Sequence, residues 1–345
     1  MATFLNYPFD PELFDYNWKA ETDPVLTAIV ESGAMQQNQE IQALIANGSD
    51  NYTIPFYDVI GGSPENYDGN TNITLSDVTG GSQTGIVYGR AHGWKEREFV
   101  IDYNSGADPM KQITSQVARY WLKQRQNILL TIADAVFGVT GSSAFASWND
   151  HKTDISSAST TVADANKIGA ATIGEALQKA VGDHADRFHL AIMHSKVATN
   201  LAALNLLSFR KYTDAQGIER QLRIADINGL TVIVDDGVPY TPATTGNDAV
   251  AAKYTTYLFG EGAFQYAPAN VNTPSEVTRD ATTGGGYNAL VTRIRETIHP
   301  NGFSFTKPGS GYTSSPTDAQ LGASTRWSVA VNPKAIAMAR IISNG

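Results

Sequence analysis

A stretch with helical periodicity, nearly thirty residues long, constrains the fold of this 345-residue chain more than any other segment. Asp108 and Pro109 supply an N-cap and a first helical residue, and Gly138 ends the segment. The apolar residues between them form one stripe: Ile113, Val117, Tyr120, Trp121, Ile128, Ile132 and Ala135. A helix over 109–137 is about 44 Å long, well beyond the average helix. We therefore expect it to be a spine along which the rest of the chain is arranged.

Charge is distributed unevenly along the chain. The first 89 residues contain one basic residue, Lys19, and twelve acidic ones, whereas the remaining 256 contain 24 basic and 22 acidic residues. Because parts of opposite charge favour head-to-tail contact between copies, this pattern indicates a chain that associates with itself.

The N-terminal arm is both acidic and aromatic. Pro8 and Pro11 oppose a helix there, and the aromatic residues follow no regular period: Phe4, Tyr7, Phe9, Phe14, Tyr16 and Trp18. We expect the arm to dock onto a neighbouring molecule, with packing against its own body as the alternative. A membrane anchor is disfavoured because such anchors pair aromatic residues with Lys and Arg.

The overall composition excludes several protein classes. Apolar residues make up 42% of the chain and charged residues 17%, which is typical of a folded protein. The absence of cysteine excludes disulfides, thiol catalysis and cysteine-ligated metal sites. We find neither a signal peptide nor an apolar transmembrane segment, and the acidic balance argues against sequence-specific nucleic-acid binding.

A long segment after the arm has the features of a projecting hairpin. Strands are expected at 52–60, 72–78, 86–88 and 98–101, separated by glycine-rich turns such as Gly61-Gly62 and Gly80-Gly81. Such a hairpin cannot bury both faces on its own body, and its acidity requires a basic partner surface. Short helices are expected near Thr22–Gly33 and Gln36–Ala46.

The second half of the chain predicts helices around a sheet. Thr172–Glu175 resembles a capping box that opens a helix, and Ser195 is expected to cap another. Leu222–Val234 contains Asn228-Gly229, the strongest hairpin signal in the chain. Further strands are expected at 188–193, 254–259, 287–298 and 326–331, whereas 140–171 is a Ser/Thr-rich loop or β excursion.

No catalytic signature is present. His184, His189 and His194 recur every five residues, a spacing unlike that of zinc pairs on a helix, so unrelated histidines are the simpler interpretation. Asp235-Asp236 could bind a cation, although a solvated turn before Pro239 is the favoured interpretation. We predict that the chain is not an enzyme and that it has no catalytic residues, no cofactor and no metal site.

The order of several motifs resembles the major capsid protein of tailed bacteriophages, whose fold is shared with encapsulin shells. The motifs are Ile54-Pro55-Phe56 through Gly62, Ser105–Pro109 leading into Tyr120-Trp121, Ala180–Asp183 with Ala191–Ser195, Gly229–Pro239, Tyr257–Ala263, and Arg326-Trp327 with Ala330, Asn332 and Pro333. Each motif is weak alone, but their order and spacing are fairly specific and cover most of residues 50–342.

The resemblance implies an α+β fold with an N-terminal arm, an extended β-hairpin loop, a long spine helix, a peripheral domain and an axial domain. The implied divisions are 1–50 for the arm with its short helices, 51–104 for the extended loop, 105–171 for the peripheral domain with spine helix 109–137, 172–265 for the axial domain, and 266–345 for the return to the peripheral domain.

The resemblance also implies a structural subunit that assembles as pentamers and hexamers into an icosahedral shell around double-stranded viral DNA, which it would not bind in a sequence-specific manner. Copies of the chain, a separate scaffolding protein and a portal are the expected partners, with decoration proteins left open and no membrane partner. We expect a virion protein assembled in the host cytoplasm. The alternatives are an encapsulin-like shell protein, another virion structural protein, or a cytosolic enzyme with an unrecognised site.

Contact between subunits is expected to join the acidic loop to a basic surface. The candidates are the arm aromatics named above, the loop acids Asp58, Glu65, Asp68 and Asp77, and the spine cations Lys111, Arg119, Lys123 and Arg125. A second basic set is Arg210, Lys211, Arg220 and Arg223. We prefer the spine set because it is expected on an accessible helix face.

Overall fold

The structure, a computed structural model, describes most of the chain after the arm. The described residues are 3–4, 7–8, 29, 33–46, 48–57, 63–70, 72, 75, 77, 80–97, 109–169, 171–213, 219–227, 229–245, 249–283, 286–309 and 314–345. Most of the expected helix near Thr22–Gly33, all but Ile29 and Gly33, and most of the aromatic arm lie outside them.

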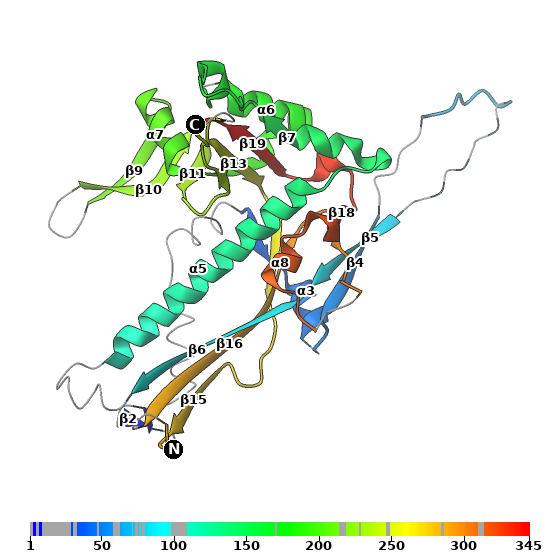
Figure 1. Cartoon of the computed structure of the whole chain (residues 1–345). Helices are drawn as coiled ribbons and strands as arrows, with labels where there is room; N and C mark the ends of the chain where they lie inside the picture. Colours follow the sequence, from blue (N-terminus) through cyan, green and yellow to red (C-terminus); the bar gives the residue numbers. More distant parts are fainter. Residues whose placement is uncertain are drawn as a thin grey trace.

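Helix α5 (Pro109–Gly138) runs diagonally along the molecule and connects its two ends (Figure 1). It begins at the predicted proline and ends at the predicted glycine. Its stripe of apolar side chains is buried: Val117, Trp121, Ile128, Ile132 and Ala135 are at most 4% exposed. The expected spine helix is therefore confirmed.

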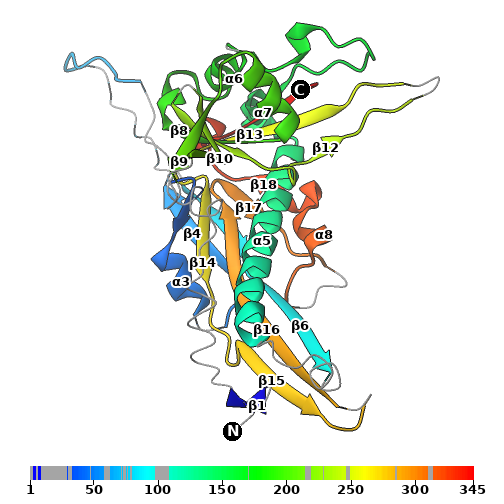
Figure 2. The ribbon, with the colours of Figure 1, turned by 90° about the vertical axis from the view of Figure 1, so that its left-hand side faces the viewer.

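The elongated end of the molecule is built on a twisted sheet packed against α5 (Figure 2). Its strands in the described residues are β3 (Met35–Gln37), β6 (Tyr88–Arg97), β14 (Phe264–Pro268), β15 (Ser275–Asp280) and β16 (Tyr287–Pro300). Along β16, even-numbered side chains from Asn288 to Thr292 are buried while the odd-numbered ones are half-buried, as expected for a strand with one face on a core. Trp121 of α5 donates to Thr292 Oγ1 at 3.0 Å and fixes the helix on this face.

A second sheet forms the other, compact end, where α6 (Thr172–Val181) and α7 (Ser195–Ala203) pack on it. Its described strands follow the order β7-β19-β13-β8-β11-β10-β9, with β12 beside β13. Their bounds are β7 Lys152–Asp154, β8 Phe188–Met193, β9 Ser208–Thr213, β10 Glu219–Ile227, β11 Leu230–Val234, β12 Tyr240–Thr241, β13 Lys253–Gly260 and β19 Met338–Ser343. The antiparallel pair β10–β11 confirms the hairpin predicted from Asn228-Gly229.

Besides β4 (Asn51–Tyr57) and β5 (Gly80–Ile86), which pair as a separate hairpin, the described chain contains several smaller elements. They are β1 (Thr3–Phe4), β2 (Tyr7–Pro8), α3 (Gln39–Ile45), β17 (Phe303–Phe305), α8 (Asp318–Leu321) and β18 (Trp327–Val329), with 3-10 helices at Ser143–His151, Asp164–Asn166, Gly182–Arg187, Ser324–Arg326 and Pro333–Ala335.

The segment 140–171 is more ordered than its composition indicates. The 3-10 helix Ser143–His151 places Trp148 in the core, where its ring stacks on Phe137 and His151 and its Nε1 donates to the carbonyl of Val136 at 3.3 Å. A single tryptophan therefore gives this Ser/Thr-rich segment a buried anchor that its average polarity conceals.

Several local expectations are wrong in detail. Asn72, Leu75 and Asp77 lie outside any strand, and Tyr88–Arg97, expected within the projecting hairpin, belongs to the sheet against α5. Helix α7 is capped by His194, whose Nδ1 accepts from the Lys196 amide, and not by Ser195. Helix α6 has Ala171 as N-cap without a side-chain hydrogen bond, so no capping box forms at Thr172.

In the described part of the chain, no helix combines the length and apolar character needed to span a membrane.

Candidate assembly surfaces

The hairpin of β4 (Asn51–Tyr57) and β5 (Gly80–Ile86) leaves the body near α3 and carries a long loop into solvent (Figure 1). The two strands pair antiparallel along their full length, from Asn51 opposite Ile86 to Tyr57 opposite Gly80. A two-stranded ribbon is marginally stable alone, so the outer part of this hairpin depends on contacts beyond its own strands.

Large apolar side chains are exposed along the outer hairpin. Tyr57 is 85% exposed, Tyr67 is 94% exposed and Leu75 is 92% exposed. Residues 63–70 are all exposed as well. Isolated apolar residues on a surface are common, but their concentration on one projecting segment is typical of an interaction site.

The loop is acidic and the structure gives its carboxylates different surroundings. Glu65, Asp68 and Asp77 are exposed, whereas Asp58 lies outside the described residues. Asp68 organises a local turn, because its carboxylate accepts from the Asn70 amide at 2.9 Å and from Asn66 at 3.3 Å. No Lys or Arg occurs between residues 20 and 89, so every Asp, Glu, Lys or Arg side chain in the loop is acidic.

The inner end of the hairpin, which we call the root, is bound to β16 and β17. Tyr52 shares a hydrogen bond of 3.0 Å with Thr297 Oγ1, which donates to the carbonyl of Ile86 at 2.8 Å. The Thr84 amide donates to Ser304 Oγ at 3.1 Å. The root is therefore fixed by buried polar contacts, in contrast to the exposed loop.

An ion pair and an arginine add to the attachment of the root. Lys307 Nζ lies 2.7 Å from Asp50 Oδ2 and lowers the pKa of that carboxyl group. Arg295 donates to the carbonyl oxygens of Gly48 and Ser49, which precede β4. The chain entering the hairpin is thus held on the sheet against α5.

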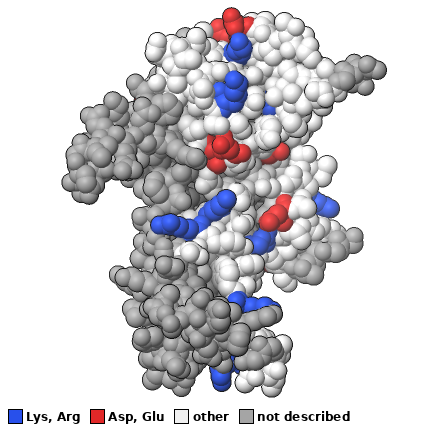
Figure 3. All heavy atoms as spheres, turned by 60° about the vertical axis from the view of Figure 1, so that its left-hand side comes forward, with Lys and Arg blue, Asp and Glu red and all other residues white. Residues whose placement is uncertain are grey.

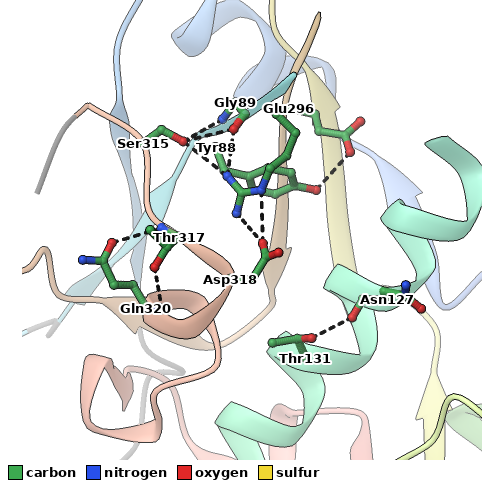
Figure 4. Close-up of polar contacts among 10 residues, drawn as sticks. Tyr88, Gly89, Asn127, Thr131, Glu296, Ser315, Thr317, Asp318 and Gln320 are labelled. Carbon is green, nitrogen blue, oxygen red and sulfur yellow. Dashed lines mark hydrogen bonds and ion pairs between the residues drawn. The ribbon is translucent and has the colours of Figure 1, made fainter. Parts of the chain in front are cut away.

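Strand β6, which follows the hairpin directly, is fixed by the segment that leads into α8 (Figure 4). Ser315 Oγ accepts from the Gly89 amide at 2.9 Å, and Arg90 forms an ion pair of 2.5 Å with Asp318. A capping box between Thr317 and Gln320 orders the start of α8, which places Asp318 beside the strand.

The accessible basic face predicted for the spine cations is contradicted at one of its four residues. Arg119 and Lys123 are exposed, whereas the side chain of Lys111 lies outside the described residues. Arg125 is 17% exposed and binds Glu296, so its expected position on an exposed face is wrong. Figure 3 shows Lys and Arg side chains at several places on this side of the molecule, with acidic side chains beside some of them.

Arg125 is part of a buried cluster centred on Glu296. Arg125 Nε and an Nη atom donate to the carboxylate at 2.8–3.2 Å, Tyr88 donates at 3.0 Å and Tyr266 at 3.1 Å. Burial, followed by the Glu296 charge, raises the pKa of both tyrosines. Burial opposes the charged form of Arg125, but Glu296, together with Tyr266 and Tyr88, more than offsets this effect and the net pKa is raised. The cluster joins α5 to the sheet and is structural.

No sequence motif points directly to this cluster around Glu296. Glu296 follows the alternating part of β16 and faces the core, where a lone acidic residue is costly without a partner. The need of a buried acidic residue for a cation therefore indicates that Glu296 has a basic partner. Spacing could not identify this partner as Arg125, because it is 171 residues away in sequence.

The remaining candidates fall largely outside the described residues. Phe4 and Tyr7 are paired within the short β1–β2 ribbon, of which only the backbone is described. Phe9, Phe14, Tyr16 and Trp18 lie outside the description, as do the side chains of Arg210, Lys211, Arg220 and Arg223. Their roles as contacts between subunits stay predictions.

A cavity of about 410 Å³ lies between α5 and the sheet, lined by Trp121, Leu122, Arg125, Tyr266, Ile294 and Glu296 among others. Its most deeply placed charged groups, Arg125 and Glu296, are bound to each other. Among the described residues, no three His, Asp or Glu side chains are grouped as metal ligands.

Comparisons with known proteins agree with this architecture. No family model matches the chain. It is 28% identical over 328 residues to the "Major capsid protein" of Bacillus phage SPP1, a match that covers 94% of this chain and 93% of that protein.

Solved capsid structures share the fold at low sequence identity. The capsid of Ralstonia phage GP4 gives a TM-score of 0.58 at 10% identity and covers 91% of this chain and 88% of its own. The capsid of Cyanophage Pam1 gives 0.55 at 12% identity and covers 94% of both chains. The resemblance expected from the motifs is thereby confirmed: this chain is similar to a phage major capsid protein and has the mixed α+β fold of tailed-phage capsids.

Proposed function

We propose that this chain is the major subunit of a phage head and that copies of it associate into a closed shell. The observation that carries this function is the projecting β4–β5 hairpin, whose loop exposes Tyr57, Tyr67 and Leu75 while its root is fixed by buried contacts. A rigidly attached segment with an uncovered apolar surface is suited to contact a neighbouring copy.

Charge supports the same association. The exposed loop contains Glu65, Asp68 and Asp77, and exposed cations elsewhere on the body include Lys95 on β6 and Arg119 and Lys123 on α5. Opposite charges on separate parts of one subunit favour heterologous contact, which closes into rings when the rotation permits. We propose that the loop of one copy lies on a basic surface of the next, with rings of five and six subunits.

The finer partners follow from the resemblance. A separate scaffolding protein, a portal and double-stranded DNA within the shell are proposed partners, as is assembly in the host cytoplasm. The acidic balance of the chain fits a container that does not adhere to nucleic acid. The arm residues Phe9, Phe14, Tyr16 and Trp18 are proposed to contact a neighbouring subunit.

The division of the chain into a peripheral and an axial domain is likewise proposed from the resemblance to capsid proteins. The sheet against α5 would form the peripheral domain, and the sheet covered by α6 and α7 the axial domain. In this arrangement α5 links both parts, since Gln126 donates to Asp235 and Tyr257 donates to Asp134 at 3.3 Å. The role of the chain is structural and not enzymatic.

Electron microscopy and size-exclusion chromatography of the purified chain, at low and high salt, test this function. We expect closed shells or discrete rings whose yield falls as salt screens the charge contacts. A monomer or dimer that is insensitive to salt, even after scaffold candidates are added, would reject the proposal.

A further inference from the structure

His299 lies at the root of the projecting hairpin, between the hairpin and the body. It is on β16 and is 1% exposed. The ring of Tyr52, from β4, meets it edge-on with centroids 6.0 Å apart, and the ring of Trp327, from β18, lies 6.4 Å away. The imidazole is therefore enclosed partly by the hairpin and partly by the body.

The polar contact of His299 is with the hairpin as well. Its Nε2 lies 3.4 Å from Oε1 of Gln83 on β5, and the same oxygen accepts from the Gly302 amide at 2.9 Å. Gln83 Nε2 donates to Asn301 Oδ1 at 3.4 Å. Because the Gln83 oxygen can only accept, Nε2 of His299 must be the protonated nitrogen of a neutral ring.

The other ring nitrogen has no place for a proton. His299 Nδ1 is buried and has no hydrogen-bond partner among the described residues. A second proton would create a buried charge with an unsatisfied N–H. Burial accordingly lowers the pKa of His299 from 6.5 to about 4.

The groups that surround His299 do not offset such a charge. Tyr52 faces the ring, and burial raises the pKa of its phenol, so it stays neutral in acid. Gln265 lies opposite His299 on β14 and is uncharged. The ion pair at the root, Asp50 with Lys307, is internally balanced, and the lowered pKa of Asp50 keeps it charged through mild acid.

We propose that His299 is an acid-sensitive latch for the hairpin, holding the root on β16 and β17 as a neutral ring and releasing it when protonated. The latch sets the orientation of the projecting segment, because the contacts of Gln83 with Gly302 and Asn301 are made at the same place. It is a property of the isolated subunit, so it can be tested whether or not shells form.

The direction of the effect follows from linkage. In the open root His299 has an ordinary pKa near 6.5, whereas in the closed root it is about 4. The open state therefore binds the extra proton between these values, and the closed state loses stability as pH falls from 6.5 toward 4. The opening equilibrium rises by about 60-fold between pH 7 and pH 4.5 and approaches its limit of about 300-fold only well below pH 4, since each pKa unit corresponds to a factor of ten.

Amide hydrogen exchange of the full chain at pH 7 and pH 4.5, corrected for intrinsic rates, tests the latch. In the wild-type chain we expect exchange of β5 and residues 300–304 to be about 60-fold faster at pH 4.5 than at pH 7. In His299→Gln, which cannot titrate, we expect the acceleration to fall below about threefold. His92→Gln, at an exposed position on β6, is the matched control and should keep the wild-type response.

An equal response of wild type and His299→Gln would overturn the latch. If His299→Gln fails to fold, exchange at the imidazole C2 position in the wild-type chain gives the pKa of His299 directly. A value near 4 supports the latch, and a value near 6.5 rejects it.

Discussion

Arg125 on the spine helix and Glu296 on β16 form a two-pronged ion pair, with nitrogen–oxygen distances of 2.8–3.2 Å and a carboxylate that is 2% exposed. Two tyrosines also donate to the same carboxylate. Paired in this way, the two charges connect the longest helix to the longest described strand, so the pair contributes to the alignment of α5 on the sheet.

Removal of Arg125 is therefore expected to destabilise the subunit. Arg125→Ala leaves Glu296 buried without its cation, and we expect the free energy of unfolding to fall by about 3–5 kcal/mol. Urea denaturation of the subunit measures this change. Lys123→Ala, two residues earlier and exposed, is the control and should change stability by less than about 0.5 kcal/mol. A loss below about 1 kcal/mol for Arg125→Ala would contradict the role of the pair.

The exposed tip of the hairpin is expected to affect assembly without affecting folding. Tyr67 is 94% exposed, so Tyr67→Ser should leave the melting temperature of the subunit nearly unchanged. If the loop contacts a neighbour, the same change should reduce the yield of shells severalfold in sedimentation and electron microscopy. Tyr240→Ser, at a position 53% exposed on the other sheet, is the matched control. Equal yields for both variants would exclude Tyr67 as a contact.

Charge reversal on the spine tests the remaining part of the predicted basic face. Lys123→Glu should weaken assembly at low salt, with a smaller effect at high salt where the contact is already screened. Lys179→Glu, exposed on α6, makes the same change in net charge elsewhere. Light scattering during assembly, measured across a salt series, compares the Lys123→Glu and Lys179→Glu variants. If both variants show the same salt dependence, the surface that contacts the acidic loop of a neighbouring copy lies away from α5.

Strong local signals made much of the fold predictable from sequence. The proline and glycine that bound α5 and the Asn228-Gly229 turn between β10 and β11 each dictate backbone geometry within a few residues. Strand β8 was likewise predictable because Phe188–Met193 is a short apolar run of strand length.

The side chains that decide the surfaces were less predictable because their surroundings come from distant segments. Arg125 lies two residues after Lys123, on nearly the opposite face of the helix. It is paired with the buried Glu296, a residue that the helix sequence alone could not identify. His299 offered no sequence signal, since its burial depends on Tyr52 and Trp327. Periodicity assigns a residue to a face of its own element but cannot identify what covers that face.

Close packing between the end of β13 and its neighbours gives a last prediction. A Cβ at Gly260 would lie 2.5 Å from the carbonyl oxygen of Arg187 and 2.8 Å from Cβ of Ala337, so Gly260→Ala forces backbone to move. We expect a loss of about 1–3 kcal/mol in the free energy of unfolding. Gly174 in α6 has open space around its Cβ position, and Gly174→Ala should stabilise the subunit by about 0.5–1 kcal/mol. Urea denaturation should therefore show that Gly→Ala lowers the free energy of unfolding at position 260 and raises it at position 174. If Gly260→Ala were neutral, the contact of β13 with the segment before β8 would be looser than these distances indicate.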